Sequence, residues 1–199
     1  MIDKIEIKKE IFRKSIHLCG AFIPFFLKKD FWLIIILLLL VCVIYFISEL
    51  LRLKNIRMPI VSHITIFASR KRDENKVSLG PITLVLGIVL ASILLPLNYA
   101  TAGIFALSFG DGFASLVGKI FGKIKISHTG GKTLEGSLAC FFAVAISVSL
   151  LTKNILLGFL TGLFAMLIEI LPLLDFDNLI IPVFTGFFLQ FLCNIFNYS

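Results

Sequence analysis

The chain has 199 residues, of which 58% are hydrophobic and 16% are charged, and its mean hydropathy is +1.02. A soluble domain carries about half apolar and about a quarter charged residues, so this composition excludes an ordinary soluble globular protein. The net charge of +7 is explained by basic anchors that face anionic lipid, and nothing in the sequence indicates a nucleic-acid partner. No Pro- or Ser-rich linker separates the apolar segments, so we expect one domain over residues 1–199.

Seven apolar segments have, or nearly have, the length of a membrane-spanning helix. The hydrocarbon core is about 30 Å thick and takes about 20 residues of helix. In chain order the segments are 15–29, 31–49, 81–97, 101–118, 134–152, 155–173 and 180–197. The first is the weakest, because Pro24 interrupts it and basic residues crowd its start. In the basic stretch 50–80, residues 60–67 are expected to lie on the membrane surface. The pattern predicts an all-α, polytopic membrane protein with about seven transmembrane helices.

The basic residues indicate the side on which each loop lies. With the N-terminus inside, sixteen of the nineteen Lys and Arg residues fall in inside segments, and only Lys28, Lys29 and Lys153 fall outside. Because cytoplasmic loops are enriched in Lys and Arg, this split predicts a cytoplasmic N-terminus. The loop at 119–132 then faces the cytoplasm, and the loop at 98–100 faces the exterior.

Carboxylates inside apolar segments are the first candidates for function, since a charge in a membrane span is costly and usually serves a purpose. Four residues meet this description: Glu49, Asp111, Glu135 and Glu169. For each of them, the alternative of a neutral or paired carboxyl that only fixes helix packing stays open.

The segment LSFGDGFASLVGKIFGK carries the most informative of these carboxylates. At helical spacing it places four polar residues on one face: Asp111, Ser115, Lys119 and Lys123. A neighbouring stripe of small residues would let another helix approach closely. A carboxylate within the span, below two lysines, suits a magnesium ion that carries a polyphosphate. Membrane anchoring explains the two lysines equally well.

The next segment, HTGGKTLEGS, has the composition of a phosphate-binding loop. Gly130 and Gly131 free the backbone to approach a ligand, Lys132 supplies a point charge, and Thr133 can cap the following helix. A helix N-terminus presents unpaired N–H groups that suit phosphate. The spacing differs from the Walker pattern, and no strand precedes it. A capped helix with a flexible loop before it is the alternative.

Two further polar groups lie at predicted span ends. The start of the first segment carries one stripe at helical spacing: Glu10, Arg13, Lys14, His17 and Gly20. The link after the sixth segment holds an oxygen-rich cluster of the kind that Mg²⁺ prefers: Asp175, Asp177 and Asn178. A snorkelling basic turn and an ordinary solvated loop are the respective alternatives.

Four motifs in order resemble those of the CTP-dependent lipid-alcohol kinases: EIFRKSIHLCG, GDGFASLVGKIFGK, GGKTLEGS and DFDNLIIP. This family includes dolichol kinase, phytol kinase and the fungal CTP-using diacylglycerol kinase, and it belongs with the phosphatidate cytidylyltransferases in a wider superfamily. The resemblance covers nearly the whole chain. It implies transfer of the γ-phosphoryl group of CTP to the hydroxyl of a membrane isoprenoid alcohol or diacylglycerol, with Mg²⁺ or another divalent cation. It also implies an integral membrane location, in the cell membrane if the source is prokaryotic, with a site that faces the cytoplasm.

The resemblance and the residue patterns above together suggest a role for each candidate residue. Metal and nucleotide would be bound by Asp111, Asp175, Asp177 and Asn178. Phosphates would be held by Lys119, Lys123, Gly130, Gly131, Lys132 and Thr133. The first helix would line the site with Arg13, Lys14 and His17. Asp111 is the first candidate for the general base and Glu135 the second, while Glu49 and Glu169 would line the site.

Two other functions compete with the kinase. A cytidylyltransferase would form a CDP-lipid from a lipid phosphate and release pyrophosphate, whereas a kinase releases CDP. A small membrane transporter would show an inverted repeat with broken helices in corresponding halves, and the sequence shows neither.

Overall fold

The computed structural model describes residues 4–54, 56 and 76–198. The predicted surface segment 60–67 lies outside the described residues. Within them every regular element is helical, and two residues of one loop form an isolated β-bridge. The elements in chain order are α1 (Lys4–Cys19), η1 (Gly20–Phe22), α2 (Ile23–Leu27), α3 (Phe31–Leu53), α5 (Gly80–Leu94), α6 (Leu97–Phe105), η3 (Ala106–Asp111), α7 (Gly112–Phe121), α8 (Leu134–Thr152), α9 (Ile155–Ile170) and α10 (Asp177–Ile195).

Four helical stretches among the described residues are long and apolar enough to cross a membrane. They are Phe31–Leu53, the continuous Leu97–Phe121 that joins α6, η3 and α7, Leu134–Thr152 and Asp177–Ile195. The apolar helices α5 and α9 are shorter. Large apolar side chains point outward, as on α3, where Trp32 is 68% exposed and Ile36 is 60% exposed. Contiguous exposed apolar surface of this kind marks an interaction surface, here with lipid. The predicted all-α fold is confirmed for the described residues, with four candidate membrane-spanning helices, while the count of seven spans and the orientation stay predictions.

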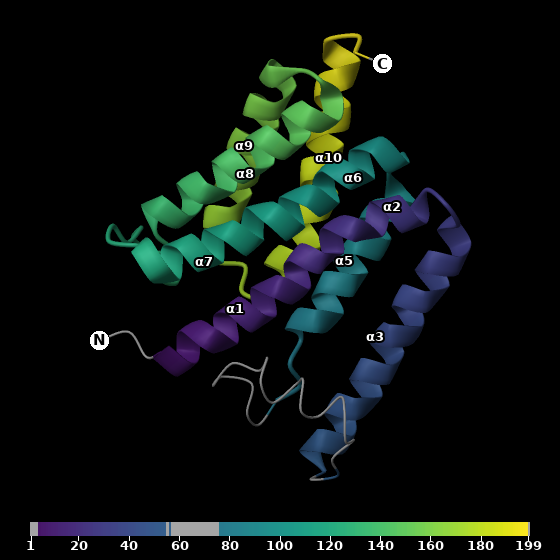
Figure 1. Cartoon of the computed structure of the whole chain (residues 1–199), viewed down its shortest axis with the longest axis vertical. Helices are drawn as coiled ribbons and strands as arrows, with labels where there is room; N and C mark the ends of the chain where they lie inside the picture. Colours follow the sequence, from purple (N-terminus) through teal and green to yellow (C-terminus); the bar gives the residue numbers. More distant parts are fainter. Residues whose placement is uncertain (1–3, 55, 57–75, 199) are drawn as a thin grey trace.

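The first predicted span, 15–29, has different bounds in the structure. The helix already begins at Lys4 and continues through the 3₁₀ turn η1 into α2, so the chain is helical to Leu27. Pro24 lies in the first turn of α2, where a missing N–H costs no helical hydrogen bond. The polar start of α1 packs against α7 (Figure 1). Partners from another helix therefore satisfy the charges that crowd the start of the predicted span.

Helices α7 and α9 pack closely against α8. On α9, Gly158 and Gly162 face α8, and a Cβ on Gly162 would lie 2.8 Å from the Phe141 carbonyl oxygen. Between α7 and α8, a Cβ on Gly136 would lie 2.6 Å from the Ala114 carbonyl oxygen. The expected small-residue contacts thus bring α7, α8 and α9 together. In Figure 1, α3 stands at one edge of the bundle, where it packs on α5 and α2.

The middle of the stretch Leu97–Phe121 is a π-helical turn, η3, that ends at Asp111. Short π-helical turns are rare and are frequent at functional sites. The extra residue in this turn changes the direction in which the following side chains leave the helix. Asp111 is therefore placed by a local irregularity within an otherwise regular span.

Candidate functional site

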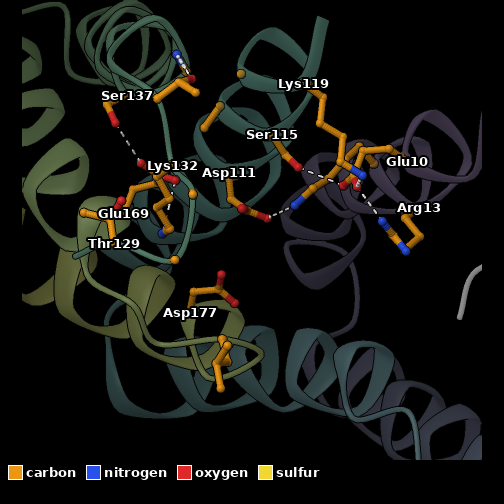
Figure 2. A pocket seen from close by; sticks show the side chains of 18 of the residues that line it. Glu10, Arg13, Asp111, Ser115, Lys119, Thr129, Lys132, Ser137, Glu169 and Asp177 are labelled. Carbon is orange, nitrogen blue, oxygen red and sulfur yellow. Dashed lines mark hydrogen bonds and ion pairs between the residues drawn. The ribbon is translucent and has the colours of Figure 1, made fainter. Parts of the chain in front are cut away.

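One end of the bundle contains an open cavity of about 430 Å³, lined by many charged and polar residues. The start of α1, the end of α7, the start of α8, the end of α9 and the start of α10 meet there, together with the loop 129–133. Ten of the sixteen residues selected from the sequence line it: Arg13, Lys14, Asp111, Lys119, Gly130, Gly131, Lys132, Thr133, Glu169 and Asp177. Segments far apart in the sequence thus converge on one site, as Figure 2 shows.

Asp111 is bound by two residues of α1. The Lys14 ammonium donates to Oδ2 of Asp111, and Nδ1 of His17 lies 3.1 Å from the same oxygen. Asp111 is only 5% exposed and Lys14 only 3%. Removing one partner of a buried ion pair leaves an uncompensated charge and is strongly destabilising. His17 does not line the cavity itself, yet this contact joins it to the site.

Glu10 is the centre of a second cluster, which connects α1 with α7 (Figure 2). Its Oε2 accepts from Arg13 and pairs with Lys119, and its Oε1 accepts from the Ser115 hydroxyl at 2.7 Å. Glu10 is 3% exposed and lies outside the four candidate membrane spans. Burial raises the pKa of its carboxyl, but the neighbouring Arg13, Lys119 and Lys14 cations outweigh burial and hold the pKa at about 2, below the ordinary value of 4.5.

Lys132 and Glu169 form the third charged group. Their Nζ and Oε1 atoms lie 3.2 Å apart, and the Ser137 hydroxyl donates to Oε2 of Glu169 at 3.2 Å. Glu169 is the last charged residue of α9 and Ser137 lies in the first turn of α8, so the tight α8–α9 packing places both at the cavity. Lys132 retains a 21% exposed side chain, which leaves its ammonium group accessible from the cavity.

The loop before α8 has the backbone that the sequence predicts. Gly130 and Gly131 have φ angles of +74° and +97°, and a Cβ on either would meet no atom within 4 Å. Only glycine adopts these angles without strain, so the backbone faces the cavity uncovered. The Thr133 hydroxyl accepts from the Gly136 N–H at 3.2 Å, which confirms it as the cap of α8. This loop can therefore bring main chain close to an anion at a helix N-terminus.

The cluster at 175–178 divides between two roles. Asp177 lines the cavity (Figure 2), and no ion pair of its carboxylate is seen within the described part of the chain. Asn178 donates instead to the Gly80 carbonyl oxygen and to the Thr83 hydroxyl, both at 3.2 Å, and so joins the start of α10 to α5. Asp175 does not line the cavity. The described residues contain no group of three or more His, Cys, Asp or Glu side chains arranged around one metal position.

Two residues of the predicted phosphate and catalytic set lie outside the cavity. Helix α7 ends at Phe121, so Lys123 does not continue the face of Asp111 and Lys119, and its side chain is exposed. Glu135 accepts from the backbone N–H groups of Lys123 and Ile124 at 3.0 and 3.2 Å. Its carboxylate therefore fastens the loop between α7 and α8 rather than facing a ligand.

Glu49 also lies away from the cavity, near the end of α3. It is fully buried, and its two oxygens accept from Arg52 at 3.0 and 2.9 Å and from the Ser78 N–H at 2.9 Å. Arg52 in turn donates to the Lys76 carbonyl oxygen at 2.6 Å. These contacts hold the segment before α5 against α3. Glu49 is thus a paired carboxylate that fixes packing, which is the alternative that the sequence left open.

The cavity contains further residues that the candidate set lacks: Glu10, Ser115, Thr129 and Ser137. Glu10 and Ser115 share helical stripes with Arg13 and Asp111, which is the signal that points to them. Comparisons of the chain with protein-family models, with curated proteins and with solved structures return no match.

Proposed function

We propose that the protein is a CTP-dependent kinase that phosphorylates the hydroxyl of a membrane isoprenoid alcohol or of diacylglycerol. The observation that carries the proposal is the convergence of Arg13, Lys14, Lys119 and Lys132 on one cavity, beside an uncovered glycine loop. Cations from three separate segments and open backbone at a helix start are what binding of a polyphosphate requires.

Phosphoryl transfer is governed by positioning and by neutralisation of charge. The cations of α1 and α7 and Lys132 would hold the phosphates from opposite sides of the cavity, while the glycine loop contacts them through main chain. Asp111 would orient the acceptor hydroxyl or take its proton, because it is a buried carboxylate that lines the cavity within the π-helical turn η3. Glu135 is a weaker candidate for that role, since it lies outside the cavity.

The donor set fits a divalent cation that is held mainly by the nucleotide. Mg²⁺ commonly takes one or two carboxylates together with phosphate oxygens and waters. Asp177, which forms no ion pair with another described residue, and Asp111 face the cavity and would serve as these carboxylates. When bound, the cation would neutralise the charge that develops on the transferred phosphate.

The membrane fold supports a lipid acceptor. The cavity lies at one end of a bundle whose outer surface is apolar, so a lipid could remain in the bilayer while its hydroxyl reaches the polar site. With the N-terminus in the cytoplasm, as the basic residues predict, the cavity opens to the compartment that contains nucleotides. We propose this orientation together with the activity.

The test is an acceptor and nucleotide screen on the purified protein in liposomes with Mg²⁺. The acceptors are farnesol, geranylgeraniol, phytol, undecaprenol, dolichol and diacylglycerol, and each is assayed with CTP, ATP, GTP and UTP. We expect a lipid monophosphate and CDP with CTP. Pyrophosphate release from a lipid phosphate would instead identify a cytidylyltransferase, and no product with any pair would reject both activities.

A further inference from the structure

Glu10 is absent from the set of residues that the proposed function uses, yet it is among the most completely coordinated carboxylates of the cavity. Its carboxylate accepts hydrogen bonds from Arg13 of α1 and Ser115 of α7 and forms an ion pair with Lys119 of α7. Glu10 is only 3% exposed. One carboxylate thus pairs with two cations that line the cavity. The carboxylate therefore connects two cationic side chains that come from different helices.

Two other cations of the cavity, Lys14 and Lys132, are paired differently. Lys14 pairs with Asp111 and Lys132 with Glu169, one carboxylate for each ammonium group. In the Glu10 cluster, by contrast, one carboxylate contacts two cations of the described cavity wall, Arg13 and Lys119. Across the cavity, Asp177 forms no ion pair with any described residue (Figure 2). Arg13 and Lys119 thus lie on α1 and α7, and the carboxylate of Asp177 lies on α10.

Arg and Lys side chains are long, and fixing them for a ligand costs rotamer entropy. Glu10 restricts both at once, because its two oxygens lie between α1 and α7 and receive a group from each helix. The low pKa of about 2 means that the carboxylate stays charged at all physiological pH values. The two cations are therefore held in place before any ligand arrives.

We propose that Glu10 is a positioning residue that fixes Arg13 and Lys119 as a preformed binding surface for the phosphate chain of the nucleotide. The inference rests on the proposed function for the identity of the ligand. It also orients the ligand, because the phosphate chain would lie against α1 and α7, across the cavity from Asp177 of α10.

Two explanations of Glu10 predict opposite effects of the variant Glu10→Gln on anion affinity. If Glu10 only adds negative charge to the cavity, its removal lowers repulsion and tightens anion binding. If Glu10 positions the two cations, the amide disorders them and binding weakens. Glu6→Gln is the charge-matched control, because Glu6 lines the same cavity one turn earlier on α1 and is exposed. It measures the effect of removing one negative charge from the α1 side of the cavity while Glu10 is kept.

The experiment is titration calorimetry of the purified protein in detergent, with Mg²⁺-pyrophosphate and, separately, with Mg²⁺-CTP. We expect Glu10→Gln to weaken pyrophosphate binding by about tenfold, equivalent to about 1.4 kcal/mol, with Glu10→Asp weakened less and Glu6→Gln unchanged or tighter.

Equal or tighter pyrophosphate binding by Glu10→Gln overturns the inference. Because pyrophosphate reports on the two cations without the nucleoside, that result is distinct from a failure of the wild-type protein to bind CTP, which counts against the proposed function. Failure of the wild-type protein to bind pyrophosphate overturns the inference as well. A thermal unfolding midpoint for each variant shows that the folded protein is being titrated.

Discussion

The buried pair of Lys14 and Asp111 allows the contributions of fold and chemistry to be separated. Replacing Asp111 by Asn keeps the size of the side chain and an oxygen for His17 but removes the counter-charge of Lys14. Since Lys14 is only 3% exposed, its ammonium group is left buried without compensation. Breaking a buried pair in this way costs about 3–5 kcal/mol. For a chain of this size, such a loss lowers the thermal midpoint by about 10 °C.

The double variant Lys14→Met/Asp111→Asn removes both charges. Replacing a complete buried pair by neutral groups is often close to neutral for stability, so the midpoint should return most of the way to the wild-type value. Turnover should not return. Loss of the electrostatic contribution at the site should keep it at least about 100-fold below wild type. The midpoint is followed by intrinsic fluorescence in detergent and turnover by lipid phosphate formation.

Two results would refute this reasoning. A wild-type midpoint for Asp111→Asn alone would show that Lys14 does not depend on the carboxylate. Near-normal turnover of the double variant would reduce the pair to helix packing, which is the alternative that the sequence left open for Asp111.

Three other predictions follow from single sites. Lys132→Gln should raise the KM for CTP strongly and Lys132→Arg should restore it only in part, because a planar guanidinium does not replace a compact ammonium; the KM for the lipid should hardly change, and an unchanged KM for CTP would remove Lys132 from the site. The lowered pKa of Glu10 means that its stabilisation is complete above about pH 4.5 and is lost as the pH falls toward 2, so acid melting curves of the wild type should lose on the order of 3 kcal/mol more than those of Glu10→Gln. In a cysteine-free background, Asn98→Cys but not Lys125→Cys, both at exposed positions, should react with an impermeant thiol reagent on intact cells, and the reverse pattern would invert the topology.

The helices could be predicted from the sequence wherever lipid decides the pattern. The predicted segment 134–152 coincides with α8, and the apolar run from residue 31 begins at the first residue of α3. The first apolar segment was predicted to begin at residue 15, whereas α1 begins at Lys4. Hydropathy treats Lys14 as a solvated charge, but the structure satisfies it with Asp111 from another helix. Long-range pairing of this kind leaves no local signal.

Helical spacing predicted part of the site correctly. Asp111, Ser115 and Lys119 do share a face, and all three line the cavity. Lys123 does not, because α7 ends at Phe121 before the next turn is complete. From the sequence, Glu135 was a candidate for the general base. In the structure its carboxylate accepts hydrogen bonds from the backbone N–H groups of the loop before α8. Spacing fixes the face of a residue within its helix but not where that helix ends or which loop returns to it.

The fate of the phosphates of CTP tests the central claim most directly. The purified protein in liposomes is incubated with Mg²⁺, a polyprenol or diacylglycerol, and CTP that carries label at either the α or the γ position. The account predicts that γ-label enters the lipid, that α-label does not, and that CDP accumulates in equal amount to the lipid phosphate. Transfer of α-label with release of pyrophosphate, or no transfer of either label while the protein remains folded, would contradict it.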